Sequence, residues 1–174
     1  TQETNKIKEL IKQYKTASGN TLLEVGCGTG HHVQHLKDSY QCTGLDINKE
    51  ILHLAREKHP ETEFIQADMI TMNLGKQFDV ITCLFSSIGY VKTYSNLEKT
   101  LDAFYNHLNS GGVAIIEPWF TKDIFSAGFP SLDVYEDDNL KIARGCVSEV
   151  ACALSILAMH YPVFVSGKNV KHFV

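Results

Sequence analysis

Apolar residues recur along the first two thirds of the chain with helical spacing in some segments and as short strand-like runs in others. Residues 6–14 predict a helix, because apolar side chains fall at i, i+3, i+4 and i+7 on one face. These side chains are Ile7, Leu10, Ile11 and Tyr14. Residues 48–58 and 94–108 predict amphipathic helices, and a shorter helical stretch reaches Leu36. The expected inward face of 48–58 consists of Ile51, Leu54 and Ala55.

Short apolar runs alternate with these helices and predict five strands, at residues 21–25, 41–45, 63–67, 78–84 and 113–117. The run at 78–84 is apolar nearly throughout, as expected for a strand buried on both faces. The triplet Ser110-Gly111-Gly112 is expected to end the helix before the last strand. Strands that alternate with helices indicate βαβ units with right-handed crossovers. The pattern therefore predicts an α/β domain with a parallel sheet at residues 1–120.

The pattern changes after Pro118. Residues 140–150, 153–165 and 170–174 predict strands without helices between them, and residues 166–169 predict a hairpin turn. We therefore expect a C-terminal antiparallel β extension at residues 121–174.

The composition, 44% hydrophobic and 21% charged, is that of a globular protein, and the net charge of −4 gives no basic footprint for nucleic acid. The longest apolar stretches, such as 152–159, are shorter than the roughly 20 residues of a membrane helix. Residues 1–15 lack the apolar core of a signal peptide. The five cysteines form no CxxC pair. We expect reduced thiols in a cytoplasmic protein without a nucleic-acid or membrane partner.

Three glycines with the spacing GxGxG lie between Glu24 and the next helix, at positions 26, 28 and 30. A strand that ends in a glycine turn and opens a helix presents backbone N–H groups to a ligand that approaches closely. The dinucleotide fingerprint GxGxxG requires glycine at position 31, where this chain has His31. A glycine turn without a ligand is the alternative, and the acidic residues further along the chain argue against it.

Asp46 follows the second strand and is the second acidic residue of the candidate site. A carboxylate at this strand end can accept hydrogen bonds from both hydroxyls of a ribose, as in nucleotide-binding folds. The alternative role is the N-cap of the following helix, but Asn48 is better placed to fill that role. Glu24, Asp46 and Asp68 fall at the carboxyl ends of three successive strands, which indicates a nucleoside site.

The glycine loop, with an acidic residue two positions before its first glycine, resembles motif I of the class I S-adenosylmethionine-dependent methyltransferases. The resemblance implies a Rossmann-like, doubly wound parallel sheet of order 3-2-1-4-5, with S-adenosyl-L-methionine as cofactor. It also implies that Asp68 accepts from the adenine amine between Ile47 and Met69. Residues 78–90 resemble motif IV, which places the end of that strand beside the methyl group. The expected cofactor-binding residues are Glu24, Gly26, Cys27, Gly28, Gly30, Asp46, Ile47, Asp68, Met69, Leu84, Phe85 and Ser86.

Two short segments, FSSIGY at 85–90 and EPWF at 117–120, are similar to segments of the amino-sugar N,N-dimethyltransferases. Glycine and sarcosine N-methyltransferases are more distant relatives. The resemblance implies methylation of the amine of a small molecule, with residues 121–174 on the acceptor-binding side. The chain departs from the family in having Tyr90 where the sugar enzymes often have His, in lacking a tyrosine-bearing segment before Thr1, and in lacking the two final core strands. We expect either a fragment of a longer chain or an enzyme without its lid.

Tyr90 and Glu117 are the candidate catalytic residues, because both are expected on loops at the carboxyl edge of the sheet, where ligands bind in open α/β folds. Either could hold the amine or accept its proton. Tyr90, Trp119 and Phe120 could form aromatic walls that attract a cation, or the last two could only pack the extension onto the core. Ser87 could cap a short helix instead of contacting the cofactor.

Several alternatives stay open. The acceptor could be an oxygen or a carbon of a small metabolite, or the protein could bind the cofactor without catalysis. A nicotinamide oxidoreductase is a further class, against which His31 and the lack of a Tyr-x-x-x-Lys motif argue. The oligomeric state is open as well, with a homodimer among the assemblies to consider.

Histidines at positions 31, 32 and 35 invite a metal interpretation, since residues four apart share a helix face. No carboxylate or cysteine joins them at ligand spacing, so we expect no metal site. Arg144, His160 and Tyr161 could line an acceptor pocket. On strands, residues at this spacing could equally alternate between the two faces of a sheet.

Overall fold

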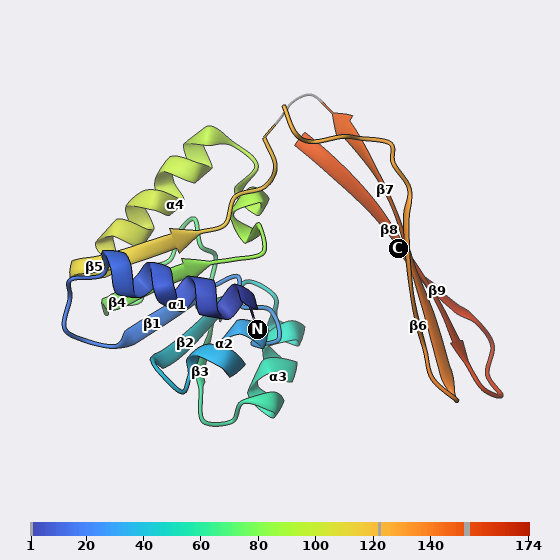
Figure 1. Cartoon of the computed structure of the whole chain (residues 1–174), viewed down its shortest axis with the longest axis horizontal. Helices are drawn as coiled ribbons and strands as arrows, with labels where there is room; N and C mark the ends of the chain where they lie inside the picture. Colours follow the sequence, from blue (N-terminus) through green and yellow to red (C-terminus); the bar gives the residue numbers. More distant parts are fainter. Residues whose placement is uncertain (1, 122, 152–153) are drawn as a thin grey trace. The chain divides into compact units, whose positions relative to one another are not determined.

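The structure is a computed structural model, and it describes residues 2–121, 123–151 and 154–174 (Figure 1). Two residues with a sequence prediction lie outside the described residues. They are Cys152, expected to be a free thiol, and Ala153, expected to begin a strand. The chain divides into two compact units, Thr1–Trp119 and Phe120–Val174. Within the described part of the chain, no helix has the length and apolarity that crossing a membrane would require.

The first unit contains a parallel sheet of five strands in the order β3-β2-β1-β4-β5, which confirms the predicted order. β1 lies at the centre and pairs in parallel with both β2 and β4. β4 is buried at every position, as its apolar sequence predicts. The bounds are β1 Thr21–Val25, β2 Gln41–Asp46, β3 Glu63–Gln66, β4 Phe78–Cys83 and β5 Leu108–Ile116.

Helices cover both faces of this sheet, and the packing clusters show which helix lies on which face (Figure 1). Side chains of α1, α2 and α3 pack on the face that carries Leu22, Val80 and Phe64, whereas α4 packs on the opposite face with Leu23 and Ile81. This is the doubly wound arrangement of Rossmann-like folds. The bounds are α1 Gln2–Tyr14, α2 His31–Leu36, α3 Lys49–Lys58, α4 Tyr94–Asn106 and a 3₁₀ turn η1 at Ser87–Val91.

Two helices differ from the sequence prediction. α1 begins at Gln2 rather than at residue 6, because buried Thr4 adds a turn that has no apolar residue to mark it. The inward face of α3 consists of Leu52 and Ala55, so the prediction for Leu54 was wrong. Leu54 is 47% exposed, because the face that meets the sheet is rotated from the one that its apolar spacing indicated.

β5 begins at Leu108, five residues before the predicted start, and includes the glycines that were expected to separate it from α4. α4 ends at Asn106 with His107 as its C-cap. Of the extra strand residues, Leu108 pairs with Phe78 of β4, and the register then shifts so that Val113 pairs with Val80. The Gly111 carbonyl also accepts hydrogen bonds from two N–H groups after α1. Tertiary partners therefore override the local tendency of this segment to break structure.

The second unit is a four-stranded antiparallel sheet in the order β6-β7-β8-β9, which confirms the predicted antiparallel extension. The predicted turn at 166–169 joins β8 to β9, with the Lys168 N–H donating to the Val165 carbonyl at 3.0 Å. β6 was not predicted, because its six residues are all exposed and mix charged with apolar side chains. The bounds are β6 Ser131–Glu136, β7 Leu140–Ala151, β8 Leu154–Val165 and β9 Lys171–Phe173.

Asp79, near the start of β4, anchors the amino ends of the central strands. Its carboxylate accepts the Thr21 N–H at 2.9 Å, the Thr21 hydroxyl at 2.7 Å and the Asn109 amide at 3.0 Å. Burial alone would raise the pKa of Asp79, but these hydrogen bonds and the charge of Lys15 together lower it. A Cβ on Gly19 would lie 2.3 Å from the carboxylate, so the strand entry is shaped around this group.

Replacing Asp79 by alanine leaves the Thr21 and Asn109 donors without their acceptor. We expect the unfolding free energy to fall by about 3 kcal/mol at neutral pH, as for a buried charged hydrogen-bond acceptor. Because the folded-state pKa is lowered, this stabilisation is present above the unfolded value of about 3.9 and is lost as the pH falls through the folded pKa. Urea unfolding measures it, with Asp102→Ala on the exposed face of α4 as control. Equal stability of the two variants would show that the Asp79 carboxylate does not stabilise the fold.

Candidate functional site

The loop after β1 is tied to the end of β2 by main-chain hydrogen bonds. The N–H groups of Gly26 and Cys27 both donate to the Leu45 carbonyl, at 2.8 and 3.0 Å. Gly26, Gly28 and Gly30 all have positive φ, of 71°, 54° and 78°. These φ angles are ones that L side chains rarely adopt, which explains the glycine pattern of the sequence.

The three glycines differ in what surrounds them. A Cβ on Gly26 would lie 2.7 Å from the Cβ of Ser87, and one on Gly30 would lie 2.8 Å from the ring of His59. A Cβ on Gly28 would have no heavy atom of the described residues within 4 Å. Packing thus requires the outer two glycines, whereas the middle one borders open space where a ligand can approach the main chain.

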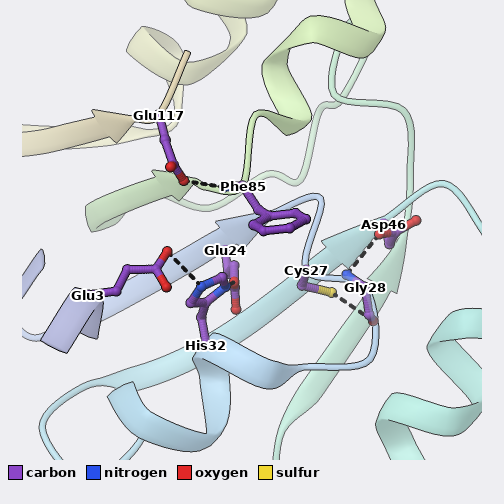
Figure 2. Close-up of polar contacts among 8 residues, drawn as sticks. All are labelled: Glu3, Glu24, Cys27, Gly28, His32, Asp46, Phe85 and Glu117. Atoms are coloured by element: carbon purple, nitrogen blue, oxygen red, sulfur yellow. Dashed lines mark hydrogen bonds and ion pairs between the residues drawn. The ribbon is translucent and has the colours of Figure 1, made fainter. Parts of the chain in front are cut away.

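Asp46 closes the loop from the side of β2. Its Oδ2 accepts the Gly28 N–H at 2.9 Å (Figure 2). Its Oδ1 accepts the Asn48 N–H at 2.9 Å. A carboxylate offers about four lone-pair sites, so both oxygens retain capacity for a further donor. Asn48 caps α3 by accepting the Ile51 N–H at 3.1 Å, which confirms that the cap belongs to Asn48 and leaves Asp46 at the edge.

Asp68 follows β3 at the same edge of the sheet. Its Oδ1 accepts the Ile70 N–H at 2.9 Å, which holds the side chain in a tight turn. The Ala67 N–H donates to the Asp46 carbonyl at 3.1 Å and joins the ends of β2 and β3. The structure therefore brings both acidic residues to the edge where the glycine loop lies.

Two apolar side chains accompany these carboxylates. Ile47 is 64% exposed directly after Asp46. Met69 is partly buried against the core, and its Cε would lie 4.0 Å from a Cβ on Gly26. Cys27 differs from them, because its side chain packs in the cluster under α2 and α3, and burial raises the pKa of its thiol. Only the main chain of Cys27 belongs to the open loop.

Glu24 points into the layer between the sheet and helices α1 and α2, rather than toward the open edge. Its Oε1 lies 3.0 Å from His32 Nδ1, and His32 Nε2 lies 3.3 Å from Glu3 Oε1 on α1 (Figure 2). Burial raises the pKa of Glu24, and the hydrogen bond to Glu24 raises the pKa of His32. His32 and the Val33 N–H oppose this rise in the pKa of Glu24 without cancelling it. Among the described residues, Glu24 Oε2 has no hydrogen-bond partner.

Sequence reasoning missed this role of His32 and the participation of Glu3. The sequence invites only a metal interpretation for the three histidines near the start of α2, and it predicts no metal site, whereas the structure uses His32 to hold a buried carboxylate. His31 and His35 contact each other through their rings, with centroids 5.2 Å apart. No local pattern relates Glu3 to His32, because 29 positions separate them along the chain.

The loop after β4 contains Leu84, Phe85 and Ser86, which were expected beside the methyl group. The Leu84 side chain packs in the core against α1, so only its main chain lies in the loop. Phe85 and Ser86 both have positive φ, of 50° and 58°, and Phe85 is 82% exposed. Ser86 precedes η1 without capping it through its side chain.

Tyr90 and Glu117 follow the neighbouring strands β4 and β5, in the segments where the sequence predicts them. Tyr90 is in η1 and is 76% exposed. The Glu117 N–H donates to the Cys83 carbonyl at 2.9 Å, which extends the pairing of β4 with β5 by one residue. The Glu117 Oε2 accepts the Phe85 N–H at 2.5 Å. Trp119 belongs to this region too, since a Cβ on Gly89 would lie 3.9 Å from the Trp119 Cβ.

In the antiparallel unit, Arg144 and Tyr161 share one face of the sheet, and Arg144 forms an ion pair with Asp133 of β6. His160 lies on the opposite face, where its ring stacks on His172 with centroids 5.4 Å apart. The three residues are thus divided by strand alternation and do not form one cluster.

Comparison with known proteins identifies the class. The family described as "Methyltransferase domain" matches residues 22–112. A dTDP-3-amino-3,4,6-trideoxy-alpha-D-glucopyranose N,N-dimethyltransferase of Streptomyces venezuelae is 34% identical over 98% of this chain and 72% of its own. A dTDP-3-amino-3,6-dideoxy-alpha-D-glucopyranose N,N-dimethyltransferase of Streptomyces fradiae is 29% identical over 98% of this chain and 67% of its own.

Solved structures agree. The crystal structure of DesVI of Streptomyces venezuelae has a TM-score of 0.92 at 33% identity and covers 98% of this chain and 72% of its own. CalS10, an amino pentose methyltransferase from Micromonospora echinaspora solved with S-adenosylmethionine bound, has a TM-score of 0.87 at 27% identity over 99% of this chain and 72% of its own.

The chain belongs to the S-adenosylmethionine-dependent methyltransferase family. Within it, the chain is similar to sugar N-methyltransferases in both sequence and structure. The enzyme class, the cofactor and the fold that the sequence predicted are therefore confirmed.

The Glu24–His32 pair makes stability depend on pH. Both raised pKa values let the folded state bind more protons than the unfolded chain. The contribution of His32 is fully present below its unfolded pKa of about 6.5 and is lost as the pH rises through the raised value. His32→Asn keeps an N–H donor near Glu24 but cannot titrate, so its unfolding free energy should fall less with pH. Urea unfolding between about pH 6 and pH 9 measures this, and parallel profiles would contradict it.

Proposed function

We propose that this methyltransferase transfers methyl groups to the amine of a sugar carried on a nucleotide, and that it forms the dimethylamine. The observation that carries the proposal is the 34% identity to an enzyme with that activity over 98% of the chain. The segments FSSIGY and EPWF support it, because they follow the neighbouring strands β4 and β5 at the carboxyl edge of the sheet.

We propose that the edge of β1, β2 and β3 holds the cofactor nucleoside. Asp46 would accept the ribose hydroxyls with the lone pairs that its two N–H donors leave. Asp68 would accept the adenine amine, with Ile47 and Met69 on either side of the ring. The open main chain at Gly28 supports this placement, since a ligand can approach it closely.

The methionine end would then lie between the glycine loop and the loop after β4. The glycine loop would line this place with the main-chain groups of Gly26, Cys27 and Gly30. Glu24, on the strand before the loop, is buried. At the loop after β4, Leu84 and Ser86 contribute main chain as well, whereas Phe85 contributes an exposed ring.

S-Adenosylmethionine supplies a methyl group that its sulfonium already activates. The residues of the chain therefore need mainly to orient an amine, keep it neutral and exclude water. The carboxylate of Glu117 is oriented by the Phe85 N–H, and we place the hydroxyl of the exposed Tyr90 against the amine. This hydroxyl can accept an N–H of the amine and fix the direction of the nitrogen lone pair.

We also propose that residues 121–174 belong to the acceptor-binding side, and that the enzyme works in the cytoplasm on a small molecule rather than on nucleic acid. The free thiols of Cys27, Cys42, Cys83 and Cys146 suit a reducing compartment. The net charge of −4 offers no surplus of cations for a phosphate backbone.

Asp46→Asn tests the ribose assignment. An amide keeps one acceptor oxygen but loses the charge and the second acceptor, so we expect S-adenosylhomocysteine to bind about a hundredfold more weakly. Calorimetry measures the affinity, and Asp102→Asn on the exposed face of α4 is the matched control. Wild-type affinity in Asp46→Asn would remove Asp46 from the cofactor site.

The acceptor is tested with a panel of nucleotide-linked amino sugars and their hydroxyl analogues, with products identified by mass spectrometry. We expect two methyl groups on the amine and none on the hydroxyl analogues. Methylation of hydroxyls alone would show an O-methyltransferase instead.

Tyr90→Phe should lower amine turnover about tenfold, the effect of one lost hydrogen bond, without weakening cofactor binding. Tyr94→Phe, at an exposed position of the next helix, is the matched control. An equal loss of cofactor affinity in Tyr90→Phe would make Tyr90 structural.

A further inference from the structure

Two consecutive residues of the loop after β4 have a backbone conformation that L-residues avoid. Phe85 and Ser86 have φ of 50° and 58°, and neither is glycine. Such a conformation is unfavourable for an L-residue and persists only where its surroundings hold it. The contacts that hold this loop therefore matter to its shape.

Those contacts come from the end of β5. The main chain of Glu117 is fixed by its 2.9 Å hydrogen bond to the Cys83 carbonyl. From this fixed position, its Oε2 accepts the Phe85 N–H at 2.5 Å (Figure 2). The Ser86 hydroxyl donates to the Pro118 carbonyl at 3.2 Å. Glu117 and Pro118 thus hold the two strained residues, one each.

The side chain that this arrangement presents is the ring of Phe85. In Figure 2 the ring points away from Glu117 and toward the glycine loop that carries Cys27 and Gly28. The ring is 82% exposed, so core packing does not fix it. Its position follows from the main chain of Phe85, whose N–H donates to the Glu117 carboxylate.

We propose that Glu117 is a positioning residue, whose carboxylate fixes the Phe85 main chain so that the ring covers the place of methyl transfer; this rests on the proposed function. Removing the proton of an amine would occupy the same carboxylate with a different task. Protonation would also weaken the hydrogen bond from Phe85, because a neutral carboxyl accepts less strongly than a carboxylate. The role needs an acceptor oxygen at this position and not a base.

Glutamine and alanine at position 117 separate the roles. Glu117→Gln keeps an oxygen that accepts the Phe85 N–H, whereas Glu117→Ala removes it. We expect kcat in Glu117→Ala to fall at least about tenfold, because misplacement near reacting atoms has large effects on rate. Glu117→Gln should recover most of that loss, with the pH profile of wild type. Glu98→Ala, at an exposed position of α4, is the matched control.

Glu117→Gln as inactive as Glu117→Ala would overturn the proposal in favour of a base. A rise in the KM for the amine in Glu117→Gln, with kcat intact, would overturn it in favour of simple charge attraction.

Exchange of the Phe85 amide proton, measured by NMR, gives a readout that needs no substrate. We expect exchange at least about tenfold faster in Glu117→Ala than in wild type, and close to wild type in Glu117→Gln. Equal exchange in all three proteins would overturn the contact. A wild-type protein that methylates none of the acceptors would refute the proposed function alone, because the exchange rates would still decide whether Glu117 holds Phe85.

Discussion

β1 pairs in parallel with β2 on one side and with β4 on the other, and the candidate site follows from this pairing. Parallel strands end at a common edge, so loops far apart in sequence meet there. Main-chain hydrogen bonds then lock the loops together. The Leu45 carbonyl holds the glycine loop, and the Asp46 carbonyl holds the turn after β3. These main-chain bonds fix the course of the loops, and the glycines at positions 26 and 30 are needed because the loops then pass close to Ser87 and His59.

The acidic residues of the site divide into two environments. Asp46 and Asp68 lie at the edge, where each accepts backbone N–H groups and can still meet a ligand. Glu24 lies one strand position before the end of β1, and strand alternation turns it into the layer under α1 and α2. A carboxylate buried there is costly unless it is paired, and His32 provides the partner. The pairing ties the start of α2 and, through Glu3, the start of α1 to the end of β1.

The sequence was sufficient where local chemistry determined the outcome. The apolar run of β4, the cap at Asn48 and the glycine spacing each have a local physical cause, and the predicted sheet order agreed with the structure. Prediction failed where partners distant in sequence decided. β5 starts early because Leu108 pairs with Phe78 of β4 and the segment after α1 donates to the Gly111 carbonyl. The contact of Glu117 with Phe85 joins residues 32 positions apart, and no pattern in either segment indicates it.

The contact between Glu117 and Phe85 can be related to the chemistry of the methyl donor. When the methyl group arrives already activated, little is gained from a strong base, and much is gained from a fixed geometry that excludes water. This is why we propose that the carboxylate at the end of β5 holds a strained main chain instead of accepting a proton. An aromatic ring set on that main chain is bulky, apolar and exposed, and these are the properties of a group that shields a reacting centre. In the proposed role of Glu117, the strain at Phe85 and Ser86 sets the direction of the ring, and the hydrogen bonds to Glu117 and Pro118 offset its cost.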